Sequence, residues 1–298
     1  MRPGGSKALT THPHRWAVVA DTMNRGFVAV LAAVLVAGCG QATLQTSEDA
    51  GAHDAGRPSD LIGSWTVSGT GEEPGMVLGL GSRLTLVRGC GKVDGQWEAG
   101  THGGFLALAT GGGQMCPFSP KVGSLPSWLA RATSFRLDGD RRELLDSHDA
   151  VVARLAPTGA DDPDAESMTT AERARLDIPP APLPAGLRPA TSADLLGRWV
   201  SSKPDAAYPD APLNLAHLEL QAENRWIGFD GCSAMGGRWL SPAAGTLLGT
   251  ILDGTLGGCT SALGGWFASA RLAGFDGDEL VLLSRSGQEY ARLKRPPP

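Results

Sequence analysis

Histidine, serine and aspartate are the residue types in this 298-residue chain that could perform acid–base or nucleophilic chemistry. Three of the six histidines lie within the first 53 residues, which leaves His102, His148 and His217 as candidates. A hydrolase triad could be drawn around His217, but the chain has no Gly-x-Ser-x-Gly elbow to present a nucleophile. We therefore expect no catalytic residues and no enzymatic activity, with a hydrolase as the alternative.

Two pairs of aspartates could in principle bind calcium, because Asp138 and Asp140 recur as Asp276 and Asp278. An EF-hand loop needs further ligands and a terminal glutamate, which are absent here. Each pair flanks a glycine, so we expect hairpin tips instead. The glycine run 111–113 is not followed by the Lys-Ser/Thr of a phosphate loop, and the chain has no dinucleotide fingerprint. We expect no metal and no cofactor.

Cys39 ends a segment with the pattern of an export signal. Residues Phe27–Val36 are ten consecutive apolar or small residues, too few to span a bilayer. The run Leu35-Val36-Ala37-Gly38-Cys39 resembles the lipobox of bacterial lipoproteins, in which the cysteine is acylated before cleavage. We expect Cys39 to carry a lipid anchor of palmitate type after removal of a signal peptide over 23–38. An ordinary secretory signal is the alternative reading.

The start of the signal is open, because Met23 stands where such a signal normally begins. Residues 1–22 are then either an upstream start-site error or a long N-terminal region. The formal charge of the chain is −5, and removing residues 1–38, with four basic and one acidic residue, takes it to −8. That sign argues against nucleic acid as a partner. We expect a protein anchored to the cell membrane and facing its extracytoplasmic side.

The chain repeats itself, which predicts two similar domains. Ser59–Trp65 returns as Ala193–Trp199 after 134 residues, and we match Leu84–Leu86 to Leu218–Leu220 at the same shift. Over the segment Gly89–Trp97, which returns as Gly231–Trp239, the shift is 142, so we place an eight-residue gain, containing Trp226, just before Cys232. Six of the tryptophans pair between the halves, as Trp65 with Trp199, Trp97 with Trp239 and Trp128 with Trp266. They fit a buried core, with a ligand cavity as the alternative.

Short alternating apolar runs predict strands in each half, and Asp-Gly at 138 and 276 predicts hairpin turns. The segments 127–133 and 265–271 suit one short helix before the final hairpin. Proline-rich residues between the halves favour a semi-rigid linker, in which a short helix at 170–176 is allowed but not required. The expected organisation is a flexible tether over 39–59, a first domain over 60–156, a linker over 157–192 and a second domain over 193–295.

The four cysteines after Cys39 predict one disulfide in each domain. Three pairings are open, and the repeat favours Cys90 with Cys116 and Cys232 with Cys259. An exported protein meets an oxidising compartment, where such bonds persist. A zinc site is the rival, but the pairs lack the short Cys-x2-4-Cys spacing and no histidine recurs in both halves.

Three motifs recur in both halves: Leu-x-Gly-x-Trp at 61–65 and 195–199, Gly-Cys-x4-Gly-x-Trp at 89–97 and 231–239, and a partial third motif at 115–116 and 255–259. Together they resemble the META or HslJ-like domains of bacterial envelope and heat-shock-associated proteins. The resemblance covers roughly 60–156 and 193–295, and departs at Gly91 and Ser233, where that family usually has Asn. It implies a small antiparallel, barrel-like β fold with a short helix, and no established enzymatic mechanism.

The sequence thus predicts a mainly β, lipid-anchored, non-catalytic envelope protein with two tandem barrel-like domains. Its expected partners are the membrane, through the anchor, and an unidentified envelope protein or small ligand. A binder of a small apolar ligand inside a barrel and a hydrolase are the alternative functions.

Overall fold

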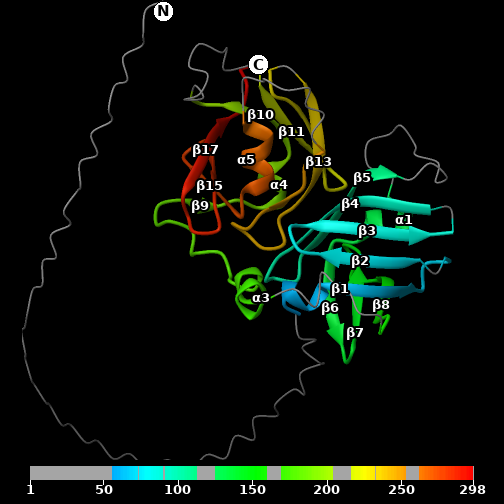
Figure 1. The fold of residues 1–298 in the computed structure, drawn as a ribbon. Coiled ribbons are helices and arrows are strands. Elements are labelled where there is room, and N and C mark those ends of the chain that lie inside the picture. Colours follow the sequence, from blue (N-terminus) through cyan, green and yellow to red (C-terminus); the bar gives the residue numbers. More distant parts are fainter. Residues whose placement is uncertain are drawn as a thin grey trace, which may run out of the picture. The chain divides into compact units, whose positions relative to one another are not determined.

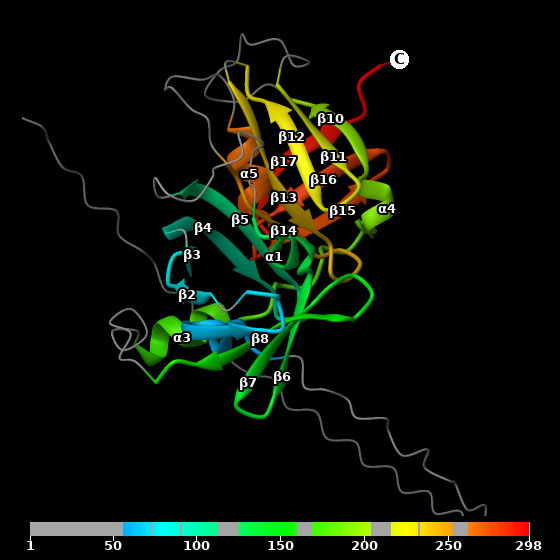
Figure 2. The ribbon, with the colours of Figure 1, turned by 90° about the vertical axis from the view of Figure 1, so that its right-hand side faces the viewer.

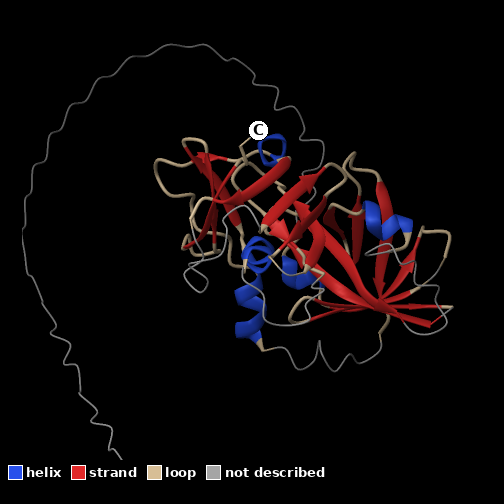
Figure 3. Ribbon diagram, turned by 90° about the horizontal axis from the view of Figure 1, so that it is seen from above, coloured by secondary structure: helices blue, strands red, loops and turns tan. Residues whose placement is uncertain are grey.

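The computed structural model of the chain describes residues 56–72, 74–89, 91–112, 125–159, 169–203, 216–231, 233–252 and 262–297. Strands dominate these residues, and the helices are few and short (Figure 3). The strands form two curled antiparallel sheets, one from each half of the chain. The prediction of a mainly β fold is confirmed.

The first sheet has eight strands in the order β5-β4-β3-β2-β1-β8-β7-β6 (Figure 1). Its edge strands meet at one point, where Phe105 N–H donates to the Thr133 carbonyl at 2.9 Å and Phe135 N–H to the Gly103 carbonyl at 2.8 Å. The sheet is therefore curled into a half-barrel. Its strands are β1 (Gly63–Ser68), β2 (Gly75–Gly79), β3 (Arg83–Arg88), β4 (Gly91–Ala99), β5 (Phe105–Gly112), β6 (Ser134–Asp138), β7 (Arg141–Leu145) and β8 (Val151–Pro157).

The second sheet repeats this order and adds one short strand, giving β14-β13-β12-β11-β10-β17-β16-β15-β9. Its curl is joined at the matching place, by Leu247 N–H to the Arg271 carbonyl and Ala273 N–H to the Gly245 carbonyl, both at 3.0 Å. Its strands are β9 (Arg188–Pro189), β10 (Gly197–Ser201), β11 (His217–Gln221), β12 (Arg225–Phe229), β13 (Ala234–Leu240), β14 (Leu248–Gly249), β15 (Leu272–Asp276), β16 (Glu279–Leu283) and β17 (Glu289–Lys294).

Strand pairing shows where the two halves correspond, and it corrects the alignment made from sequence. Trp65 on β1 pairs with Met76 on β2, while Trp199 on β10 pairs with Leu218 on β11. Leu218 therefore corresponds to Met76, at a shift of 142 residues, and the match of Leu84–Leu86 to Leu218–Leu220 is wrong. The eight-residue gain lies between β10 and β11, not before Cys232. Apolar strands of similar composition can be matched one strand out of step, because periodicity does not distinguish them.

The short helices and tight turns lie where the repeat predicts them. Each half has a helix before its final hairpin, α1 (Ser127–Arg131) and α5 (Leu263–Ser269). Figure 2 shows β6 and β7 joined as a hairpin, whose two-residue loop begins at Gly139 with φ of 58°. The loop between β15 and β16 begins at Gly277 with φ of 59°. Glycine at the first loop position with positive φ is the arrangement of a type II′ turn.

The Leu-x-Gly-x-Trp motif folds an indole back onto the chain that precedes it. Trp65 Nε1 donates to the Leu61 carbonyl at 2.9 Å, and Trp199 Nε1 to the Leu195 carbonyl at 2.7 Å. The glycine between them has φ of 151° at Gly63 and 100° at Gly197, a region that side chains rarely adopt. The motif glycine is therefore required by the turn that brings Trp to Leu.

The second motif glycine is required by a close approach between strands. A Cβ at Gly95 would overlap the Leu108 carbonyl, and one at Gly237 would overlap the Thr250 carbonyl. Both glycines precede a buried tryptophan by two residues, which places Trp97 on β4 and Trp239 on β13 in their cores. Each half-barrel encloses a separate cluster of buried apolar side chains.

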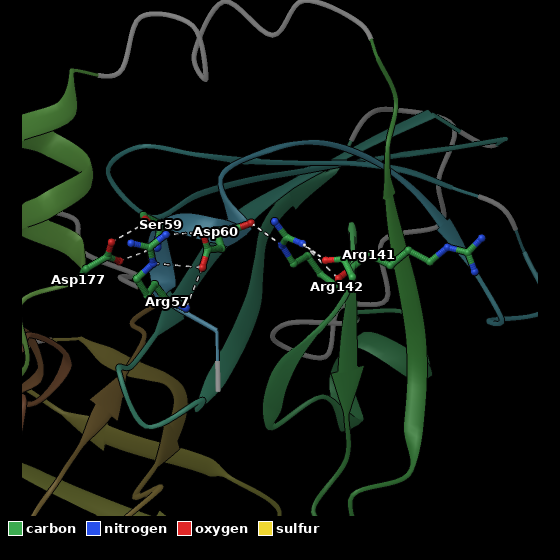
Figure 4. Close-up of polar contacts among 7 residues, drawn as sticks. Arg57, Ser59, Asp60, Arg141, Arg142 and Asp177 are labelled. Carbon is green, nitrogen blue, oxygen red and sulfur yellow. Dashed lines mark hydrogen bonds and ion pairs between the residues drawn. The ribbon is translucent and has the colours of Figure 1, made fainter. Parts of the chain in front are cut away.

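The described part of the connecting segment is attached to both half-barrels. It contains the helix that the sequence allowed, α3 (Thr170–Leu176), then β9 and α4 (Ser192–Leu195). Asp177 accepts hydrogen bonds from Ser59 N–H at 2.9 Å and Ser59 Oγ at 2.6 Å (Figure 4); Ser59 lies in a short 3-10 helix, η1 (Pro58–Leu61), at the start of the first half. Arg285 in the second half donates to the Leu176 carbonyl at 3.0 Å.

Candidate functional site

The predicted lipidation and disulfide residues, Cys39, Cys90, Cys116, Cys232 and Cys259, lie outside the described residues. The anchor and the two disulfides therefore stay predictions. No helix of the described stretches is long and apolar enough to cross a membrane. Within the same stretches, no group of three or more His, Cys, Asp or Glu side chains could hold a metal ion.

One histidine has a serine partner, which is the feature that a hydrolase reading requires. Ser147 Oγ lies 3.3 Å from His148 Nδ1 in the turn between β7 and β8. The carboxylate of Asp146 accepts the backbone N–H groups of His148 and Ala150, and the first of these bonds is the largest cause that lowers its pKa. That carboxylate builds the turn and orients backbone amides, whereas a catalytic triad needs it to orient the imidazole. The arrangement is that of a hydrogen-bonded turn.

The aspartate pairs lie at hairpin tips, as expected. Asp138 and Asp140 flank Gly139 between β6 and β7, and Asp276 and Asp278 occupy the same places between β15 and β16. Asp276 also accepts a hydrogen bond from Arg292 at 2.7 Å. These carboxylates serve turns and surface ion pairs.

Six tryptophans of the described residues are buried in the cores and donate their indole N–H groups to the protein, while Trp266 is half-buried on α5. Trp97 donates to the Gly79 carbonyl at 3.0 Å and Trp128 to Glu72 at 3.2 Å. Trp226 is also core: it is 1% exposed and donates to the Thr250 carbonyl at 2.9 Å. The expectation that this unpaired tryptophan lies in the eight-residue gain is wrong. Trp226 is the strand partner of Gly237, as Leu84 is of Gly95, so Trp226 has the counterpart Leu84 in the first half.

A cavity of about 680 Å³ lies between the two half-barrels. The first half lines it with β5, α1 and the turn between β7 and β8, and the second half with β12, β13 and the turn before β12. Its apolar side chains include Ile227, which is 42% exposed. Pockets of this volume hold small organic ligands in other proteins. The apolar lining residues are Leu108, Leu125, Ala130, Trp226, Ile227, Ala234, Met235 and Leu252.

Arg238 is the buried charge of this cavity and connects the two halves. It lies on β13, is 7% exposed, and donates from Nη1 to the Ala107 carbonyl at 3.2 Å and the Leu129 carbonyl at 3.5 Å. Burial first, and the charge of Arg225 second, lower the pKa of Arg238 to about 10. In the part of the chain that the structure describes, no carboxylate forms an ion pair with this guanidinium. A buried charge is normally paired.

A second arginine directly faces it. Arg225 on β12 is the strand partner of Arg238 on β13, so the two side chains leave the same face of the sheet. The same place in the first half holds Arg83 opposite Gln96. Like charges directly opposite each other are destabilising. The second half has therefore gained a repulsive pair at the cavity.

Sequence reasoning did not find this cavity, because its walls come from residues far apart in the chain. Arg238 contacts Ala107 and Leu129, which belong to the other half. A local difference is present between the motif Gly and Trp, where the first half has Gln96 and the second half has Arg238. Strand positions next to a core tryptophan point to the opposite face and are commonly charged, so this difference alone does not indicate a buried site.

Comparison with known proteins returns nothing: no family model, no curated protein and no solved structure matches this chain. The resemblance to META or HslJ-like domains therefore depends on the motif residues alone.

Proposed function

We propose that this chain is a lipid-anchored, non-catalytic binding protein of the bacterial cell envelope, and that the cavity between its half-barrels holds a small ligand. The observation that carries the binding function is this cavity of about 680 Å³, with its apolar wall and the buried Arg238. An apolar wall combined with oriented polar groups is typical of small-molecule sites.

The ligand is assigned to the space between the half-barrels, not to the interior of one. Each interior is occupied by buried tryptophans whose N–H groups bond to the protein, such as Trp97 in the first half and Trp199 in the second. Two repeats held together by Arg238 therefore create a site that one repeat does not have.

The anchor, the family and the disulfides are supported by sequence. The lipobox-like run ending at Cys39 supports attachment to the outer face of the cell membrane. In both halves the first motif glycine has a positive φ and the second allows a close approach between strands. This shared requirement supports a common META or HslJ-like origin of two small barrel-like domains. The matched spacing of Cys90 with Cys116 and Cys232 with Cys259 supports one disulfide in each.

Native mass spectrometry of protein gently extracted from its own membrane tests the binding function. We expect an extra mass of a small molecule that is lost on denaturation. An Ala234→Trp variant places a large side chain at the exposed, cavity-lining start of β13 and should abolish this mass. An Ala171→Trp variant, exposed on α3 away from the cavity, is the matched control and should keep it.

A bare chain in the wild type, or a mass that Ala234→Trp leaves unchanged, would contradict ligand binding in this cavity. An extra mass of protein size would instead identify an envelope protein partner.

A further inference from the structure

We propose that the cavity takes an apolar molecule with a single acidic head group, of the fatty-acid kind, whose head binds between Arg238 and Arg225. This inference rests on the proposed binding function and adds the chemical class of the ligand.

The first step is the unmatched charge of Arg238. Its guanidinium is buried, and both of its side-chain hydrogen bonds leave from Nη1 toward neutral carbonyls. Arginine has five N–H donors in a planar fork that suits a carboxylate. The N–H groups of Nε and Nη2 therefore remain able to donate hydrogen bonds to an acceptor bound in the cavity that Arg238 lines. An anion there would offset both causes that lower the pKa of this arginine, its burial and its neighbour.

The second step is the like-charged pair. Arg225 and Arg238 face each other across β12 and β13, and no carboxylate of the described residues is ion-paired with either of them. The first half has Gln96 in place of the second arginine. An acidic head group between the two guanidinium groups would convert their repulsion into attraction.

The third step is the balance of the remaining cavity charges. Arg131 adds a third cation, while Asp146, Glu223 and His148 also line the cavity. The carboxylate of Asp146 is already bound by two backbone N–H groups of its own turn. Three arginines against two carboxylates leave an excess of one positive charge among these groups, which fits a single acidic group.

The fourth step is the apolar wall next to these cations. Ile227 lies two residues from Arg225 on the same face of β12, and it is 42% exposed. Gly236, its strand partner, lies two residues before Arg238 and leaves the sheet surface open beside it. A chain that starts at the arginines can therefore continue over Ile227 toward Leu108 and Leu252.

Calorimetry with three probes of equal chain length tests the head group. Decanoate, decan-1-ol and decylammonium are titrated into the full chain below their aggregation limits. We expect decanoate to bind at least about tenfold more tightly than decanol, because a charge-assisted hydrogen bond contributes about that factor. Decylammonium should bind more weakly than both.

Two variants test the arginines. Arg238→Gln gives the second half the residue found at Gln96, and Arg225→Gln changes an exposed side chain. Each should weaken decanoate binding about tenfold and leave decanol binding unchanged. Arg141→Gln, on an exposed hairpin residue outside the cavity, should change neither.

Equal affinity for decanoate and decanol, or decanoate binding unaffected by Arg225→Gln, would overturn the acidic head group. If Arg238→Gln fails to fold, the decanoate affinity of Arg225→Gln alone still tests the acidic head group. Absence of decanoate binding to the wild type also overturns this inference, while the proposed binding function is judged separately by the native mass lost in Ala234→Trp.

Discussion

Arg142 and Arg295 make the same two contacts in the two half-barrels, although they occupy different places in the repeat. Arg142 donates to the Asp60 carbonyl at 2.9 Å (Figure 4), and its guanidinium lies 5.6 Å from the centre of the Trp65 ring. Arg295 donates to the Asp194 carbonyl at 3.0 Å and lies 3.8 Å from the Trp199 ring. One arginine belongs to β7 and the other follows β17. Both halves therefore have an arginine that binds the aspartate carbonyl and covers the motif tryptophan, but the arginine comes from a different part of the repeat in each half.

Replacing either arginine should lower stability by a similar amount. Arg142→Gln and Arg295→Gln each lose the hydrogen bond to an aspartate carbonyl and the cation–π contact, which together contribute roughly 1 kcal/mol. Arg142 also donates to the exposed Gly139 and Arg141 carbonyls of its own hairpin. Urea unfolding of the two variants measures this. Arg141→Gln, next to Arg142 but exposed, is the control. If either variant unfolds like the control, the shared contact does not stabilise that half.

The two motif glycines should tolerate no side chain. Gly95→Ala and Gly237→Ala would each push a Cβ into a backbone carbonyl of the next strand, and we expect a loss of about 3 kcal/mol. Gly265→Ala should have the opposite effect, because this glycine is exposed in α5 with open space around it. Alanine there should add roughly 0.5–1 kcal/mol. Thermal unfolding of the three variants checks the signs.

Asp194 should make stability depend on acid pH. Its bonds to Arg188 first, and to Thr191 second, lower the pKa of its carboxyl from 3.8 to about 2 in the folded protein. The unfolded chain binds the proton more readily, so the contribution is fully present above pH 3.8 and disappears as pH falls through 2. Asp194→Asn should thus lower the unfolding temperature at pH 6 but have little effect near pH 2. An equal difference at both values would contradict this assignment.

The predicted disulfides should account for a large part of the stability of each half. A loop of about 27 residues closed by a disulfide contributes roughly 3 to 4 kcal/mol in the chain-entropy view. A reductant should therefore lower the unfolding temperature of the wild type. It should have no effect on a variant in which Cys90, Cys116, Cys232 and Cys259 are all serine. Peptide mapping without reduction would show whether the pairs form within each half.

The predicted anchor is tested by Cys39→Ala, which removes the residue that is acylated. We expect the variant to leave the membrane fraction, because stable attachment depends on the acyl chains. Cys90→Ser is the matched control and should stay membrane-bound. Retention of Cys39→Ala in the membrane fraction would refute the lipid anchor.

The duplication, the β character, the helix before each final hairpin and the glycine turns could all be predicted from the sequence. These features follow from local spacing, which a repeat shows twice. The alignment of the strands could not be predicted. Matching by sequence placed β3 and β11 in correspondence, because Leu84–Leu86 and Leu218–Leu220 have the same apolar alternation. Only the pairing of Trp199 with Leu218 revealed the true shift.

The cavity could not be predicted in this way, because its walls form only when the halves pack together. Arg238 appears in the sequence as one arginine among many, and nothing local indicates that it is buried against Ala107 and Leu129. The difference between Gln96 and Arg238 becomes informative once both are known to face an arginine across the same strand pair.

In each half the first strand pairs with the last one, β1 with β8 and β10 with β17, and this pairing limits the order in which the protein can fold. Trp65 on β1 pairs with Pro157 on β8, so synthesis delivers one partner long before the other. Neither half can complete its sheet until its C-terminal hairpin has emerged. Both β8 and β17 carry the run Ala-Arg-Leu, at 153–155 and 291–293. A waiting β1 can therefore accept the strand of the wrong half, and exchange of strands between tandem repeats is a characteristic error of such chains.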